Sequence, residues 1–210
     1  MLNEKDIIKI NKIEEGKKKK PTPVLDSLNV THKDATIIFS DRAAAKLFAL
    51  LLLCDDTEVA WHGSVDRIET GKYRVDDIYL YPQSTSGVTV NSEEYGLWQY
   101  NTLLNEPEKI EKMCLHGHSH VNMKVSPSGV DLDYQADTIE MVQPDCFYIF
   151  MIVNRRFEYY FRIIDRADGV EYKSAKIDTD SGALLELSAQ YKECIKENTY
   201  SKTISNYRYL

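Results

Sequence analysis

The stretch MCLHGHSH, residues 113 to 120, predicts a strand that leaves an apolar core and carries histidines on one face. Alternate side chains of a strand point the same way. His118 and His120 would therefore project together, about 6 to 7 Å apart along the backbone, and two imidazoles at that spacing can hold one metal ion with bonds of about 2.0 to 2.1 Å. The stretch thus predicts two nitrogen ligands, His118 and His120, for one metal ion.

A carboxylate follows the two histidines at a distance that suits the same ion. Residues 121 to 127 are rich in Asn, Ser and Pro and predict a loop, and residues 128 to 131, Ser-Gly-Val-Asp, then open an amphipathic helical stretch. Asp131 would face back toward the loop from the first turn. Two imidazoles and one carboxylate leave a fourth position for water, which is typical of a catalytic zinc site. We therefore predict that His118, His120 and Asp131 bind Zn²⁺.

Hydrolysis at such a site needs a general base, and Glu58 is the candidate. Residues 57 to 65 form a β-prone run after a helical stretch, so Glu58 is a charged residue that enters an otherwise apolar strand. A glutamate beside the metal could take a proton from water and pass it to a leaving amine. The plainer alternative is that Glu58 only marks the solvated start of the strand.

The spacing of these residues resembles a known metal motif. His118-x-His120, seven further residues, Ser128, two more and Asp131 reproduce without a gap the motif of the JAMM metalloproteases, the catalytically competent MPN domains. The resemblance implies that the two histidines and Asp131 bind zinc, that Glu58 activates the water, and that Ser128 stabilises the tetrahedral oxyanion. Ser128 and Asp131 are equally a helix N-cap pair, and both roles can hold together.

The resemblance also carries expectations for the fold and the substrate. It implies a single α/β (α+β) domain of the MPN/JAMM type, with a mostly antiparallel central sheet flanked by helices. We assign residues 35 to 180 to this domain, residues 1 to 34 to a polar N-terminal arm, and residues 181 to 210 to a C-terminal helix and tail. Family substrates are peptide or isopeptide bonds next to ubiquitin-like tails, so a protein or peptide substrate is expected.

The chain departs from the family pattern at two positions. Many members carry Pro directly after the second histidine, where this chain has Val121. Many also carry Gly at the third position after the glutamate, where this chain has Trp61, although Gly63 is close by. The second departure leaves the choice of base open, and the substitutes for Glu58 are Glu69, Glu93 and Glu94.

Two more histidines lie near the motif. His116 continues the alternation of His118 and His120, so a site with three imidazoles is conceivable, but a role in orienting a ligand or a structural role is preferred. His62 shares a strand face with Glu58 and could line the same cleft. A lone histidine on a strand is more often a hydrogen-bonded neutral side chain.

Composition predicts an acidic, soluble, cytoplasmic protein. The 210 residues are 43% hydrophobic and 28% charged with a net charge of -7, so no nucleic-acid surface is indicated, and the basic run at residues 17 to 20 reads as a solvated linker. The apolar run at residues 43 to 54 is shorter than the about 20 residues that a bilayer requires, so no membrane partner is expected. The amino-terminal residues lack the pattern of a signal peptide.

Other functions compete with a zinc peptidase. MPN-type domains without the ligand set serve as non-catalytic scaffold or assembly subunits, and a phage or bacterial assembly protease with one structural substrate would have the same fold. An amidohydrolase or phosphoesterase usually draws further histidines from later strands, and the sequence has none after His120. The tyrosine-rich residues 200 to 210 are a candidate surface for a partner or for a second copy in a homo-oligomer.

Overall fold

The computed structural model describes residues 23–26, 28–31, 33–53, 56–86, 89–91 and 93–182. The expectations for residues 1 to 22 and for the C-terminal helix and tail after residue 182 lie outside this range. Within it, residues 29 to 31 of the expected N-terminal arm form a strand of the main sheet.

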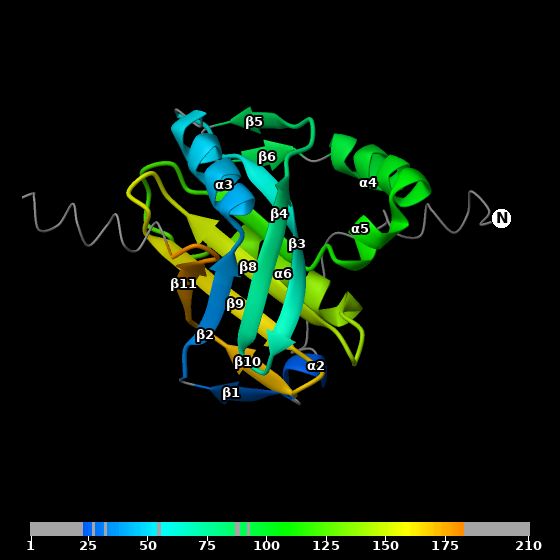
Figure 1. Ribbon diagram of the computed structural model, residues 1–210. Coiled ribbons are helices and arrows are strands. Elements are labelled where there is room, and N and C mark those ends of the chain that lie inside the picture. Colours follow the sequence, from blue (N-terminus) through cyan, green and yellow to red (C-terminus); the bar gives the residue numbers. More distant parts are fainter. Residues whose placement is uncertain are drawn as a thin grey trace, which may run out of the picture.

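One curled sheet of nine strands makes up most of the described chain (Figure 1). Four of its eight neighbouring pairs are parallel and four are antiparallel. The strands lie in the order β1 (Asn29–Thr31), β10 (Val170–Tyr172), β9 (Tyr159–Asp165), β8 (Phe147–Val153), β7 (Leu115–Ser119), β3 (Ala60–Glu69), β4 (Lys72–Tyr79), β2 (Ala35–Phe39) and β11 (Ala175–Thr179).

The helices are few and short. Those of the described residues are α2 (Pro23–Asp26), α3 (Asp41–Leu53), α4 (Glu93–Asn105), α5 (Pro107–Glu111) and α6 (Gly129–Met141). A separate hairpin is formed by β5 (Ser84–Ser86) and β6 (Thr89–Asn91). The expected α/β domain of the MPN type, with a mostly antiparallel sheet flanked by helices, is therefore wrong: the sheet is a half-barrel of mixed strands.

The curl of the sheet follows from how its last strands are connected. β10 lies next to one edge strand and β11 is the opposite edge, yet only Lys173 and Ser174 separate them in the chain. Three Cα–Cα steps join Tyr172 to Ala175 and span at most about 11 Å, so the two ends of the sheet must approach each other. A hydrogen bond of 2.6 Å from the Tyr73 hydroxyl on β4 to Asp165 on β9 crosses the same interior. β10 and β11 thus follow each other in the chain but lie near opposite ends of the strand order.

Short-range contacts define several of these elements. A strand covers Ala35–Phe39, and Ser40 caps α3 by accepting a hydrogen bond of 3.0 Å from the Ala43 amide. β8 and β9 form a hairpin around Asn154. No helix in the described ranges combines the length and the apolar character that crossing a membrane requires.

The two faces of β7 have different environments, and this difference positions the site. Leu115 is fully buried in the main apolar core, together with Trp61 and Phe39, and Gly117 and Ser119 alternate with it on the same face. The histidines of β7 lie on the opposite face. There α6 packs through Ile139 on Phe150 and Ile164, which form a second, smaller core cluster. The site is therefore built between the sheet and α6.

Gly117 is required by the close packing of Trp61. The two residues are cross-strand partners on β7 and β3, and the Trp61 ring is 0% exposed. A Cβ added to Gly117 would lie 2.3 Å from Trp61 Nε1 and 2.4 Å from Cε2, far inside van der Waals contact. Position 117, between His116 and His118, therefore accommodates only glycine, because any side chain there would overlap the Trp61 ring.

We predict that Gly117→Ala destabilises the protein by about 1 to 3 kcal/mol or more, because the ring cannot move in a filled core. Urea denaturation of the metal-free protein measures this. Gly129→Ala is the matched control, since a Cβ at Gly129 meets nothing within 4 Å, and it should change the stability by less than about 0.5 kcal/mol. Equal stabilities for the two variants would contradict the packing argument.

Candidate metal centre

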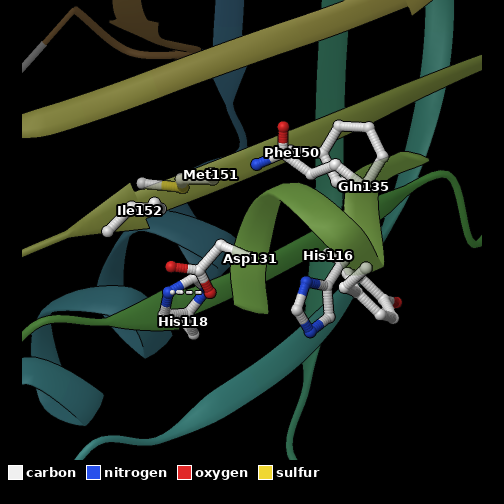
Figure 2. A pocket seen from close by; sticks show the side chains of 8 residues that line it. His116, His118, Asp131, Gln135, Phe150, Met151 and Ile152 are labelled. Atoms are coloured by element: carbon white, nitrogen blue, oxygen red, sulfur yellow. Dashed lines mark ion pairs between the residues drawn. The ribbon is translucent and has the colours of Figure 1, made fainter. Parts of the chain in front are cut away.

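The three predicted ligands converge on one point. Figure 2 shows two of them, His118 and Asp131, with the ion pair between them. His118 Nε2 lies 3.1 Å from His120 Nε2 and 3.2 Å from Asp131 Oδ1, and His120 Nε2 lies 3.6 Å from Asp131 Oδ2. Donors bonded at about 2.0 to 2.1 Å to a tetrahedral ion are about 3.3 to 3.4 Å apart. The three distances, two of which end on different oxygens of Asp131, are each close to the donor spacing of a tetrahedral metal site.

The ligands come from two elements. β7 pairs with β3 on one side and β8 on the other, with His118 opposite Ala60 and Ile152. Asp131 lies in the first turn of α6, where Ser128 caps the helix. The Ser128 amide donates to Asp131 Oδ2 at 2.7 Å, and Ser128 Oγ accepts from the Asp131 amide at 3.2 Å. This capping box confirms the N-cap role of Ser128 and fixes the rotamer of Asp131.

A hydrogen bond to the loop sets the tautomer of His120. His120 Nδ1 lies 2.7 Å from the carbonyl oxygen of Lys124. A carbonyl can only accept, so Nδ1 carries a hydrogen, and Nε2 is the nitrogen that faces Asp131 and His118. Nε2 is thereby oriented as the nitrogen that would bind a metal.

The carboxylate of Asp131 stays ionised in this setting. Burial alone would raise its pKa, but hydrogen bonds from His118, His120 and Ser128 outweigh burial and hold the pKa well below its usual range. The hydrogen bond with Asp131 also raises the pKa of His120 against the opposing effect of burial. The group is thus an anionic oxygen beside two imidazole nitrogens, a donor set suited to a divalent cation.

Glu58 lies beside the three ligands. It precedes β3 by two residues, and the antiparallel register that pairs Ala60 with His118 brings Glu58 opposite His120. Its side chain is only 8% exposed. Burial raises the pKa of Glu58, the charges of His120 and His118 lower it, and that of Asp131 raises it. The expected strand start at residue 57 is three residues too early, since β3 begins at Ala60.

Of the alternative glutamates, Glu69 does not share this position. Glu69 ends β3 at the opposite end from Glu58, is exposed, and lies 3.4 Å from Lys72 Nζ. The side chains of Glu93 and Glu94 lie outside the described part of the chain.

Two supports of Glu58 were not found by sequence reasoning. Ser119, between the two ligand histidines, accepts a hydrogen bond of 3.0 Å from the Val59 amide through Oγ, and its own amide donates to the Val59 carbonyl at 2.9 Å. Gln83 brackets the backbone of Ala60 by accepting from its amide at 2.8 Å and donating to its carbonyl at 2.9 Å. Alternation along β7 could have suggested Ser119, but nothing local in the sequence indicates Gln83.

His62 and His116 form a buried, neutral layer beside the ligands. Burial lowers the pKa of His62 to about 3 and that of His116 well below its ordinary value. Their ring centroids are 5.0 Å apart, and His116 also packs on Tyr134 at 4.6 Å. His116 lines a small pocket next to His118, and neither ring belongs to the ligand group found among the described residues.

Residue 121, directly after His120, has a strained backbone. Val121 has φ of 45°, in the left-handed region that branched side chains avoid. The turn between β8 and β9 holds it there: the Arg155 amide donates to the Val121 carbonyl at 2.7 Å, and Asn154 Nδ2 donates to the Met123 carbonyl at 2.9 Å. Proline is locked near a φ of about −65°, so the residue that many JAMM members carry here does not fit this backbone.

No family model and no curated protein matches the chain. Membership of the JAMM family therefore stays a prediction that rests on the spacing of His118, His120, Ser128 and Asp131.

We predict that Val121→Pro lowers the free energy of unfolding by about 3 kcal/mol or more, because the ring cannot adopt a positive φ. Val121→Ala should cost at most about 2 kcal/mol, since it loses only two buried methyl groups and relieves branching at the strained position. Chemical denaturation compares the two. A proline variant as stable as the alanine variant would mean that the backbone here is not left-handed.

Proposed function

We propose that this protein is a zinc-dependent hydrolase that cleaves peptide or isopeptide bonds. The observation that carries the proposal is the spacing of His118, His120 and Asp131, with a buried glutamate beside them. Three protein donors leave one corner of a tetrahedron free, which is the pattern of catalytic rather than structural zinc sites.

The donor chemistry supports zinc as the resident metal. Two imidazole nitrogens and one carboxylate oxygen suit Zn²⁺, and zinc adopts the tetrahedral geometry that the donor spacings match. Magnesium and calcium prefer all-oxygen sites with six or more ligands. When bound, zinc would supply an electrophile that polarises a carbonyl and acidifies water.

The remaining chemistry falls to side chains of this chain. Glu58 takes a proton from the attacking water as the new C–O bond forms, and delivers that proton to the nitrogen as the C–N bond breaks. The products are a carboxylic acid and an amine. Ser128 Oγ accepts a hydrogen bond from the Asp131 amide, so the hydroxyl hydrogen of Ser128 can donate to the oxyanion of the tetrahedral state.

The proposed substrate is a protein or peptide, and the resemblance to JAMM enzymes suggests the tail of a ubiquitin-like protein. An assembly protease acting on one structural protein would use the same groups. A non-catalytic scaffold would need neither the converging donors nor a buried Glu58, which costs stability to desolvate. This cost favours a hydrolase over a scaffold.

We predict that the protein binds a single zinc ion per chain, measured by elemental analysis after dialysis against dilute Zn²⁺. Loss of a residue that only hydrogen-bonds a metal ligand weakens metal binding by about 10- to 100-fold. Because Asp131 is itself a proposed ligand, Asp131→Ala should weaken zinc binding by more than about 100-fold. Asp133→Ala is the matched control, because Asp133 is an exposed carboxylate on the same helix, and its zinc affinity should be unchanged. Absence of stoichiometric zinc from the wild type would refute the proposed function.

We predict that Glu58→Gln lowers turnover by about 100- to 10,000-fold while zinc stays bound, because the variant removes only the proton carrier. The assay combines linear and isopeptide-linked ubiquitin-like fusions with a peptide library, each with and without a chelator. Glu69→Gln, at the far end of the same strand, should keep full activity. If Glu58→Gln cleaves at the original rate, another group is the base.

A further inference from the structure

Helix α6 carries Asp131, and a buried polar network attaches this helix to the sheet. We propose that Gln135, held by the buried ion pair of Arg162 and Glu171, is a positioning residue that fixes Asp131 and so sets the metal affinity. This inference rests on the proposed function, since it concerns the same site. Gln135 does not belong to the ligand group and does not touch the reacting atoms.

The contacts of Gln135 link three elements. Gln135 lies one helical turn after Asp131 on the same face of α6 and is 2% exposed (Figure 2). Arg162 Nη1 on β9 donates to Gln135 Oε1 at 3.2 Å. Arg162 Nε in turn donates to Glu171 Oε1 on β10 at 2.8 Å.

Stabilising the packing of α6 on the sheet does not require this network. Glu171 is 5% exposed, and burying a charged pair costs desolvation that its attraction only about offsets, so apolar residues of similar volume often serve stability as well. The helix already makes apolar contacts with the sheet, where Ile139 packs on Phe150 and Ile164. The network therefore provides something that apolar contact lacks.

The network fixes the position and rotation of α6 on the sheet. Apolar contacts are non-directional and let a helix slide or rotate at little cost, whereas hydrogen bonds weaken steeply with misalignment. The capping box fixes the Asp131 side chain relative to α6, but not α6 relative to the sheet. A helix rises about 1.5 Å per residue, so a slip of less than one residue would carry the carboxylate out of bonding range of the imidazoles.

The test is the zinc affinity of Gln135→Leu, measured by competition with a fluorescent chelator. Leucine keeps the volume and removes the hydrogen bond from Arg162, and we expect zinc to bind about 10- to 100-fold more weakly. Urea denaturation of the metal-free protein, run in parallel, confirms that the variant is folded in the binding assay. Should Gln135→Leu fail to fold, the double variant Arg162→Met with Glu171→Met removes the donor to Gln135 and is expected to weaken zinc binding in the same way.

Thr138→Val is the matched control. Thr138 is also buried on α6, but its hydroxyl donates to the Tyr134 carbonyl within the helix at 2.9 Å, so its loss should leave zinc affinity unchanged. If Gln135→Leu binds zinc as tightly as the wild type, or if Thr138→Val weakens binding equally, the positioning role is overturned while the zinc site stands. If the wild type itself binds no zinc, the proposed function fails and the inference fails with it.

Discussion

The antiparallel pairing of β3 with β7 is the constraint on which the site depends. Its register sets Ala60 opposite His118, which brings Glu58 to the two ligand histidines on one face and Trp61 onto Gly117 on the other. Because side chains alternate, a slip of one residue would turn every histidine into the core and every core residue outward. The tight packing of the Trp61 ring on glycine penalises such a slip, so the core on one face secures the geometry on the other.

The second half of the site depends on how α6 sits on the sheet. β7 contributes His118 from a strand that is hydrogen-bonded on both sides, and His120 directly follows this strand with its amide bonded to the Val153 carbonyl at 2.9 Å, so both nitrogens are firmly held. The third donor comes from a helix that touches the sheet through few apolar side chains. Tight metal binding requires all three donors to be held in place, and the carboxylate on the helix is the least constrained of them. Directional contacts such as that between Arg162 and Gln135 therefore matter most on the helix side.

Sequence reasoning succeeded where a property is set by near neighbours. Alternation placed the histidines on one face, and the Ser128 to Asp131 spacing predicted the helix cap and the third donor. It failed on the fold class, because hydrophobic runs and turns reveal hairpins but not which distant strands lie side by side. The parallel pairing of β11 with β2 and the buried contacts of Arg162 join segments far apart in the chain, and no local pattern encodes them.

Several features that cost stability gather along β7 and just after it. Val121 has a positive φ, Glu58 is a buried carboxylate, and the buried His62 and the partly buried His116 are imidazoles held neutral. Each breaks a rule that the rest of the chain obeys, and a sequence selected for stability alone would have replaced them with apolar or unstrained residues. Their concentration around three converging donors is the expected signature of a site kept for its chemistry, and it argues for a hydrolase more strongly than any single residue does.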